Sequence, residues 1–259
     1  MEPYQRLITQ LQQLGSLAVA FSGGVDSTLL LRAAHQATGG QVLAITVDGP
    51  MQFRSELAEA RKLAARIGVQ QLELPIGWHD LPGLATNPPD RCYHCKRFIL
   101  TRCQKELPLG YQLCEGSTID DLQAHRPGRR AVVELGVRSP LLEAGLGKAD
   151  IRSISRQLAL PTWDKPAQSC LLTRFPHDTL LAVADLQRVE TCEEALHGLG
   201  FSMVRVRSLG TTARLEFIGE ELAAAQLPAM TKKIVNVCNV AGFSVVLIDQ
   251  AGYRSDSMD

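Results

Sequence analysis

The most informative stretch of the sequence is Leu17-Ala-Val-Ala-Phe-Ser-Gly-Gly-Val-Asp-Ser-Thr28. Its first part, Leu17 to Phe21, is an apolar run with the length of a buried strand, and an apolar helical pattern begins at Leu29. A strand, a glycine-rich turn and a helix, in this order, aim backbone N–H groups and a helix N-terminus at an anion. The stretch therefore predicts a phosphate-binding loop at the end of the strand.

The polar residues of this loop suit a nucleotide. Gly23 and Gly24 allow a tight turn and a close approach of phosphate, because neither carries a Cβ. Ser22 and Ser27 offer hydroxyl donors, and Asp26 can cap the helix or hold Mg²⁺ against phosphate oxygens. The Gly-Lys-Ser/Thr ending of a Walker A loop is missing. The loop resembles the PP-loop, Ser-Gly-Gly-x-Asp-Ser, of the N-type ATP pyrophosphatases, which cleave ATP between its α- and β-phosphates. The alternative is an ordinary glycine turn before a helix.

Composition narrows the class of protein. The chain has 259 residues, a hydrophobic fraction of 45%, and 27 basic and 27 acidic side chains. This length allows one large domain or two modest ones. Because nucleic-acid enzymes usually carry a basic surplus, the neutral balance argues against a nucleic-acid partner. No apolar run approaches the roughly twenty residues of a membrane span. The N-terminus is polar rather than signal-like, which predicts a cytoplasmic protein.

Strand-like and helix-like patterns alternate through the first part of the chain. Apolar runs at 17–21, 42–47, 70–74 and 111–115 are typical of strands, and helical spacing fills residues 53–67 and the segment that ends at Leu107. The alternation predicts an α/β fold, a parallel sheet with helices on both faces. Together with the PP-loop resemblance, it implies a Rossmann-like PP-loop ATP pyrophosphatase domain. Ligands of such folds bind at the C-terminal strand ends. Asp48, which follows the second strand, is therefore predicted to lie beside the bound nucleoside.

A proline-bounded loop, Leu160 to Pro166, predicts a domain boundary. We assign residues 1–166 to the PP-loop ATP pyrophosphatase domain and residues 167–259 to a small α+β C-terminal domain. The second domain is predicted to contain a helix over 178–199, strands over 201–207 and 213–218, a mostly helical segment over 220–239 and a last strand over 243–248.

Seven cysteines occur without a secretion signal, so free, metal-bound or catalytic thiols are favoured over disulfides. Cys92-x-x-Cys95 could be a redox pair, half of a zinc site, two ligands of an iron–sulfur cluster, or a pair without function. Cys170 could supply a third thiolate. The other four carry no motif, and the first two of them have the pattern of core residues: Cys103, Cys114, Cys192 and Cys238.

Two further groups of residues could take part in chemistry. Cys170 lies between Lys165 and Arg174, and cationic neighbours favour the thiolate nucleophile. The alternative is a buried structural cysteine. Arg205 and Arg207 are two apart on a strand-like run, so both side chains project from one face and suit phosphate or carboxylate recognition. The alternative there is a solvated sheet face with a glutamate, Glu216, as the partner.

Several segments together make the chain similar to the LarE family of ATP-dependent sulfur transferases, which form the bisthiocarboxylate ligand of the nickel-pincer nucleotide. The resemblance covers nearly the whole chain. Besides the PP-loop, it rests on residues 87–96, 115–122, 125–128, 134–141, 160–174, 205–207, 213–216 and 252–258.

The resemblance implies the reaction and its cofactors. ATP and Mg²⁺ bind at Ser22 to Ser27, and a carboxylate of pyridinium-3,5-biscarboxylic acid mononucleotide attacks the α-phosphate to give an acyl-adenylate. A sulfur at Cys170 then displaces AMP. Family members with one site cysteine give up its sulfur and keep dehydroalanine. Members with three hold a [4Fe-4S] cluster that delivers an extra sulfide. Because this chain has Cys92, Cys95 and Cys170, the resemblance favours the cluster.

The resemblance also assigns roles to residues of the second domain. Glu193 and Arg174 are expected to act in catalysis with Cys170. Arg205 and Arg207 are expected near the phosphate and substrate. Thr173 is expected to contribute to cofactor binding, and it stands where the family has a serine, which preserves the hydroxyl. The family further implies a small-molecule substrate and a homo-oligomer.

Other functions remain open at this point. A PP-loop tRNA thiolase also adenylates its substrate, and some of these enzymes use three-cysteine clusters. An ammonia-using amide ligase would share the PP-loop, although the cysteines would have no evident use. A nucleotide-binding regulatory subunit would bind ATP without turnover.

Overall fold

The computed structural model describes residues 2–122 and 126–254. The chain forms two compact units, which we call unit 1 (residues 1–81 and 90–168) and unit 2 (residues 82–89 and 169–259). The boundary after residue 168 lies close to the one expected after residue 166. The segment 82–89, expected in the first domain, instead belongs to unit 2. His125 and residues 255–258, which contribute to the LarE resemblance, lie outside the described residues.

Unit 1 is built on a parallel sheet in the order β3-β2-β1-β4. In this sheet β1 pairs with β2 on one side and with β4 on the other, with Val19 opposite Ala44 and Cys114. The strand order therefore reverses at β1, which makes its carboxyl end the topological switch point where α/β proteins bind ligands. The strands are β1 (Leu17–Ala20), β2 (Val42–Asp48), β3 (Gln70–Pro75) and β4 (Gln112–Cys114).

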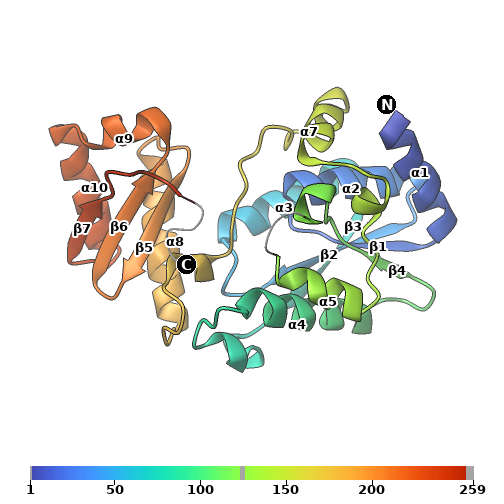
Figure 1. Cartoon of the computed structure of the whole chain (residues 1–259), viewed down its shortest axis with the longest axis horizontal. Coiled ribbons are helices and arrows are strands. Elements are labelled where there is room, and N and C mark those ends of the chain that lie inside the picture. Colours follow the sequence, from blue (N-terminus) through green and yellow to red (C-terminus); the bar gives the residue numbers. More distant parts are fainter. Residues whose placement is uncertain (1, 123–125, 255–259) are drawn as a thin grey trace. The chain divides into compact units, whose positions relative to one another are not determined.

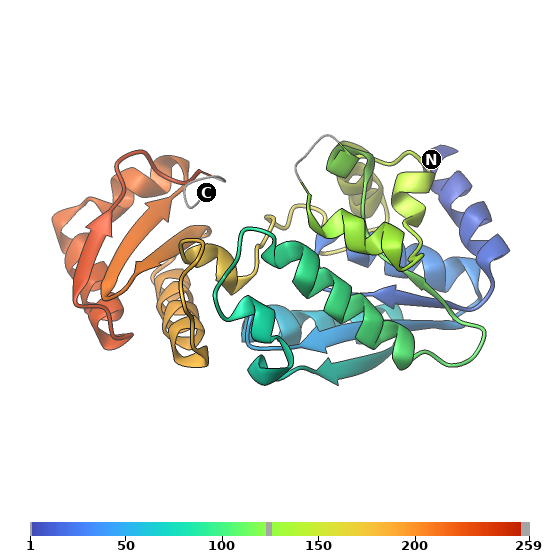
Figure 2. The same cartoon turned by 60° about the horizontal axis from the view of Figure 1, so that its bottom comes forward.

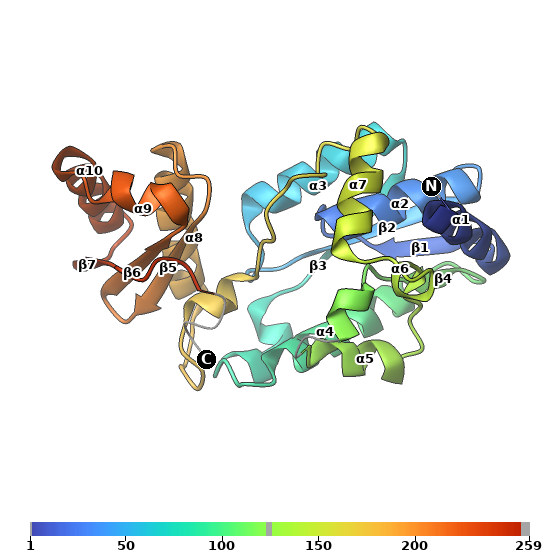
Figure 3. The same ribbon diagram turned by 45° about the horizontal axis from the view of Figure 1, so that its top comes forward.

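Helices cover both faces of this sheet, as the sequence predicts (Figures 1 and 3). One face carries α1 (Glu2–Leu14), α2 (Val25–Ala37), α3 (Arg54–Ile67) and α7 (Lys148–Gln157), and the other carries α4 (Arg91–Lys105) and α5 (Gly128–Glu134). The short α6 spans Pro140–Glu143. The basic segment 126–130 contains the start of α5.

The main core of unit 1 lies between the sheet and the first helical layer. Leu7 and Leu11 of α1 are fully buried there, together with Leu17 of β1 and Leu30 of α2. Leu7 and Leu11 are four residues apart, which places both side chains on one face of α1. This packing holds β1 and α2 rigidly, and with them the loop that connects the two.

Unit 2 contains a three-stranded sheet in the order β5-β6-β7, with an antiparallel β5–β6 pair and a parallel β6–β7 pair (Figure 2). The elements are α8 (Val183–Gly198), β5 (Val204–Leu209), β6 (Thr212–Phe217), α9 (Gly219–Ala225), α10 (Pro228–Val240) and β7 (Val245–Ile248). The helix expected over 178–199 is shorter, because α8 begins only at Val183. The segment 220–239 is mostly helical, as expected, and it is interrupted before Pro228, which lacks the N–H that would continue a helix.

Among the described residues, we find no helix that combines the length and the apolar character needed to cross a membrane.

Candidate functional site

Hydrogen bonds from hydroxyl groups within the PP-loop stabilise its turn. Ser22 Oγ lies 3.2 Å from Ser27 Oγ, and Ser27 Oγ donates to the Gly24 carbonyl at 3.3 Å. Gly23 has φ +73°, and a Cβ there would come within 3.1 Å of the Ala60 backbone in α3. The loop therefore needs glycine at this position, both for its conformation and for its contact with α3. Because the N-cap of α2 is Gly24, no capping side chain covers the first N–H groups of that helix.

Asp26 carries the acidic group of the loop. Its Oδ2 accepts a hydrogen bond from Lys148 Nζ, at the start of α7. Its Oδ1 is buried and has no hydrogen-bond partner among the described residues, and the same holds for Thr28 Oγ1. Buried polar atoms are normally paired. These two oxygens are therefore available to bind a ligand or a cation. The arrangement suits a Mg²⁺–phosphate complex bound at Asp26.

The loop after β4 lies against the PP-loop. A Cβ on Gly116 would meet Asp26 Cβ and the Ser27 nitrogen at 3.4 Å. The preceding residue, Glu115, is buried and accepts hydrogen bonds from Lys96 Nζ at 2.7 Å and Ser139 Oγ at 2.6 Å. Burial raises the pKa of Glu115, but Lys96 and the hydroxyl donors outweigh this effect and hold it below its ordinary value. Lys96 and Glu115 thereby tie α4 to the edge of the ATP loop.

Lys165 fixes the loop that leaves unit 1. Its Nζ donates to Glu56 Oε2 at 2.8 Å, to Glu59 Oε2 at 2.7 Å and to the Gly23 carbonyl at 3.4 Å. Burial lowers the pKa of Lys165, whereas the two carboxylates raise it, and the net shift is upward. The sequence suggested Lys165 as a cationic neighbour of Cys170. The structure shows its charge balanced by two carboxylates of α3.

Asp48 stands at the carboxyl end of β2, where the sequence places it. Its carboxylate pairs with Arg54 and lies 3.8 Å from Arg61 Nη2. About one third of the side chain is exposed, at 31%. The predicted contact of Asp48 with the nucleoside stays a prediction.

The seven cysteines divide by accessibility. Cys92 is exposed, and Cys95 and Cys170 are half-buried. The other four are fully buried: Cys103, Cys114, Cys192 and Cys238. The three accessible thiols are the three that the sequence selected as sulfur ligands.

Cys92 and Cys95 lie three residues apart in the first turns of α4, so their side chains share a helix face. Two thiolates spaced in this way fit two ligands of a cluster. Cys170 belongs to unit 2. Over residues 2–122 and 126–254, no group of three histidine, cysteine or acidic side chains is arranged as a metal site.

A buried arginine holds the turn that carries Cys170. Cys170 precedes a 3₁₀ helix, η4 (Leu171–Arg174). The guanidinium of Arg174 donates to Glu193 through Nε at 2.8 Å and Nη2 at 2.9 Å. Its Nη1 donates to the Ser169 carbonyl at 3.1 Å, the Cys170 carbonyl at 3.2 Å and Thr173 Oγ1 at 2.8 Å. Arg174, Glu193 and Thr173 thus fix the backbone around the Cys170 thiol.

Arg207 holds the same turn from β5. Its Nη1 donates to the Thr173 carbonyl at 2.7 Å, its Nε to Glu216 at 2.9 Å, and its Nη2 to the Arg254 carbonyl at 3.2 Å. Glu216 is the partner that the sequence suggested, and it also accepts from Arg214 at 3.2 Å. The face is buried rather than solvated, because Arg207 is 3% exposed and Glu216 is 0% exposed.

Arg205 is buried at least as deeply as Arg207. It is 2% exposed, and its guanidinium carbon lies 5.6 Å from the centre of the Tyr253 ring. Burial, with the charge of Arg174 second, lowers the pKa of Arg205 to about 10. The sequence predicts that Arg205 and Arg207 bind the cofactor. The structure gives Arg207 internal partners and places both guanidinium groups in the interior of unit 2.

Sequence reasoning missed one residue of this region, Asn87. It has φ +50° and no exposed surface. Its Nδ2 group donates to the carbonyls of Leu172 at 3.3 Å, Phe175 at 3.1 Å and Pro176 at 2.8 Å. Asn87 therefore holds the Cys170 turn through its side chain. The available signal is an asparagine directly before Pro-Pro, since asparagine tolerates the left-handed conformation better than most residues.

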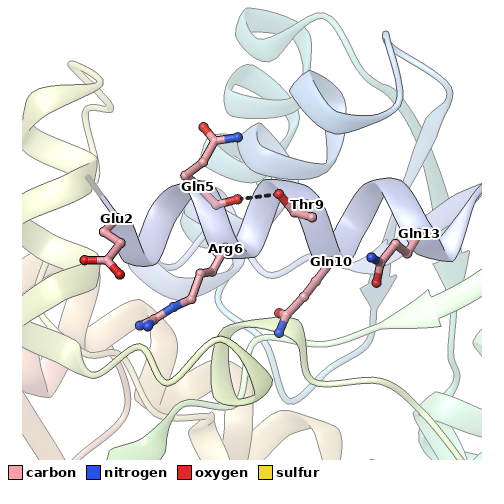
Figure 4. Close-up of a pocket in the computed structure, with 6 residues that line it drawn as sticks. All are labelled: Glu2, Gln5, Arg6, Thr9, Gln10 and Gln13. Carbon is pink, nitrogen blue, oxygen red and sulfur yellow. Dashed lines mark hydrogen bonds between the residues drawn. The ribbon is translucent and has the colours of Figure 1, made fainter.

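Among the described residues, two open hollows lie on the surface of unit 1. One follows the outer face of α1, where the side chains of Arg6 and Gln10 project between the helix and the loop after α6 (Figure 4). Arg6 donates to the Ala144 carbonyl at 3.4 Å there. The other lies beside α5 and is lined by Asp121, Leu122, Arg126, Arg129, Arg130, Val133 and Glu134. Neither contains a residue that the sequence assigns to catalysis.

Comparison with known proteins agrees with this geometry. The sequence model of the asparagine synthase family matches residues 6–101, which include the PP-loop. An uncharacterized protein of Synechocystis is 38% identical over 95% of this chain and 93% of its own length. The pyridinium-3,5-bisthiocarboxylic acid mononucleotide synthase of Lactiplantibacillus plantarum is 30% identical over 98% of this chain and 92% of its own length.

A more distant relative carries a different name. The tRNA(Ile)-lysidine synthase of Burkholderia mallei is 28% identical over 91% of this chain, which corresponds to 50% of that protein. The match to the mononucleotide synthase, in contrast, extends over nearly the full length of both proteins.

Proposed function

The chain belongs to the LarE family of ATP-dependent sulfur transferases, and from this membership we propose that it converts carboxylates of pyridinium-3,5-biscarboxylic acid mononucleotide into thiocarboxylates. The observation that carries the proposal is the near full-length match to the mononucleotide synthase, joined to a PP-loop at the switch point of the sheet. ATP and Mg²⁺ are the cofactors of this PP-loop family.

In the proposed first half-reaction, the residues of unit 1 activate a carboxylate. The loop Ser22–Ser27 and the N-terminus of α2 hold the phosphates, and Asp26 would hold Mg²⁺ through Oδ1, which has no hydrogen-bond partner among the described residues. A carboxylate oxygen attacks the α-phosphorus, the bond to the β-phosphate oxygen breaks, and pyrophosphate leaves. Lys148 beside Asp26 helps to balance the charge that develops on the phosphates. The product is an acyl-adenylate, whose AMP is a far better leaving group than oxide.

In the proposed second half-reaction, sulfur replaces the activated oxygen. We assign Cys92, Cys95 and Cys170 as the ligands of a [4Fe-4S] cluster, because these are the accessible thiols and the family uses three cysteines in this way. When bound, such a cluster would supply the sulfide that ends in the thiocarboxylate. Arg174 and Glu193 hold the Cys170 turn. AMP departs with the electron pair of the broken carbon–oxygen bond.

The cluster assignment is tested by anaerobic reconstitution with iron and sulfide. The expected protein is brown, absorbs at about 400 nm and holds about four irons per chain. The Cys92→Ser variant should lose both the colour and the iron. Colourless, iron-free protein would overturn the assignment. A protein that becomes lighter by about 34 Da after one turnover would instead show that Cys170 gave up its own sulfur and became dehydroalanine.

The partner proposed for this enzyme is a small pyridinium mononucleotide rather than nucleic acid, and the family resemblance favours a homo-oligomer. Filter binding with bulk tRNA at moderate salt separates this proposal from a tRNA thiolase. Salt-sensitive micromolar binding would favour the thiolase, because phosphate contacts release counterions. Light scattering of the purified chain measures its oligomeric state.

A further inference from the structure

A guanidinium at the start of α4 has no use in the function described so far. Arg91 is the first residue of this helix and is only 7% exposed. Its Nε and Nη1 are buried and have no hydrogen-bond partner among the described residues. Arginine is almost never buried without a partner, because the desolvation of an unpaired charge is costly. The burial of Arg91 therefore indicates a binding site for an anion.

The backbone around Arg91 favours an anion as well. The helix α4 has fifteen residues, so its N-terminus carries the positive end of a full helix dipole. The N-cap residue, Asp90, makes no side-chain cap, and its Oδ2 instead lies 2.8 Å from His94 Nε2. Side chains in a helix lean toward its N-terminus, which directs the Arg91 side chain to the same end.

The carboxylates that contact α4 already have other partners. Glu134 accepts from Tyr93 Oη at 2.7 Å and from Arg130 Nε at 2.8 Å. Glu115 accepts from Lys96 Nζ at 2.7 Å. Among the described residues, neither carboxylate pairs with Nε or Nη1 of Arg91, so these two groups can bind an anion from outside the chain.

We propose that Arg91 and the N-terminus of α4 bind an oxyanion of the nucleotide substrate, either a carboxylate or a phosphate monoester. A carboxylate presents two oxygens in one plane, and a phosphate monoester presents two oxygens on one face. A guanidinium binds either arrangement with two parallel N–H···O hydrogen bonds. Cys92 follows Arg91 directly, so an anion bound here is held beside a predicted sulfur ligand. The substrate identity rests on the proposed function, whereas the anion site rests on Arg91 itself.

This proposal predicts two effects of opposite sign for Arg91→Met. Methionine fills a similar space without charge, so the ligand-free enzyme loses a buried, unpaired cation and its Tm stays equal or rises, by about 2 °C. Oxyanion binding should weaken by about tenfold or more, since a charge-assisted bidentate pair is lost. A structural role for Arg91 predicts the reverse, namely a lower Tm. The matched control is Arg97→Met, which removes the same charge from an exposed position of α4.

The test is calorimetric titration of the wild type and both variants with inorganic phosphate and with pyridine-3,5-dicarboxylate, while saturating α,β-methylene-ATP occupies the PP-loop. Weaker binding of one probe to Arg91→Met only, with an unchanged or higher Tm, supports the site and identifies the anion as phosphate or carboxylate. Equal affinities for both probes in all three proteins, or a clear fall in Tm, overturn it. If Arg91-dependent binding persists but the pyridinium nucleotide yields no pyrophosphate, the proposed function fails and the site stands.

Discussion

Arg174 and Glu193 face each other in two parallel hydrogen bonds, of 2.8 and 2.9 Å, and both side chains are fully buried. Glu193 Oε1 also accepts from the Val206 nitrogen at 2.8 Å. This ion pair therefore joins η4, α8 and β5, and it lies directly behind the Cys170 carbonyl. A buried ion pair adds little net stability compared with an apolar pair. The role of this pair is therefore to fix the relative positions of η4, α8 and β5.

Removing one partner of this pair should destabilise the protein strongly. Glu193→Gln leaves the Arg174 guanidinium buried without a counter-charge, which should cost about 3–5 kcal/mol in the free energy of unfolding. Urea denaturation measures this loss. A loss of less than about 1 kcal/mol, as for an exposed pair, would contradict the burial of the pair. In samples that remain folded, sulfur transfer should fall while release of pyrophosphate continues.

Cys170→Ala should abolish sulfur transfer and preserve adenylation. In the proposed mechanism the thiol acts only after the acyl-adenylate has formed, and the ATP loop lies in unit 1, whereas Cys170 lies in unit 2. The measurement is pyrophosphate release alongside mass spectrometry of the nucleotide product. Equal loss of both activities would refute this separation of the two half-reactions.

The hydrogen bonds of Asn87 to three carbonyls should be needed for sulfur transfer. Asn87→Gly keeps the left-handed backbone but removes the side-chain donors, so the Cys170 turn loosens and the rate of sulfur transfer should fall about tenfold or more. Asn87→Ala should be less stable than Asn87→Gly by about 1 kcal/mol, because alanine is strained at positive φ. The control is Asp178→Gly, at an exposed residue with φ +56°, which should leave transfer unchanged. Equal rates for Asn87→Gly and the wild type would show that the turn is held without it.

Glu115 should make the free energy of unfolding depend on pH in the acidic range. Its pKa in the folded protein lies below the ordinary value of 4.5. The carboxylate therefore contributes its full stability above about pH 4.5, and this contribution is lost as the pH falls through the lower, folded pKa. Glu115→Gln should flatten the slope of unfolding free energy against pH in that acidic window. An unchanged slope would mean that Lys96 and the hydroxyl donors do not favour the ionised form.

Three of the seven thiols should react quickly with iodoacetamide in the folded, cluster-free enzyme, namely Cys92, Cys95 and Cys170. Burial raises the pKa of Cys103 and of Cys114 to about 12, and Cys192 is shielded beside Cys238, 3.3 Å away. Peptide mass spectrometry after a short reaction identifies the modified residues. Rapid labelling of Cys103 or Cys238 would contradict the core described for either unit.

Local patterns were sufficient for much of the architecture. The alternation of strands and helices predicts the parallel sheet, and Ser22 to Ser27 predict the phosphate loop, because both depend on near neighbours in the chain. The errors occurred where distant contacts override local propensity. Residues 178–182 have helical character in sequence, but the Leu181 nitrogen donates to the Ala85 carbonyl and Asp178 takes a left-handed backbone, so α8 starts later.

Motifs and periodicity are properties of short segments, so the family, the ATP loop and the three cysteines proposed as ligands could be identified without a structure. Which polar groups pair depends on the folded chain. Asp26 meets Lys148 across 122 residues, Asn87 meets Leu172 across 85, and Arg174 meets Glu193 across 19. Such pairs depend on how packed helices and strands bring distant polar groups together, and polar residues in isolation give no sign of their partners. The same packing buries Arg91, whose Nε and Nη1 have no hydrogen-bond partner among the described residues.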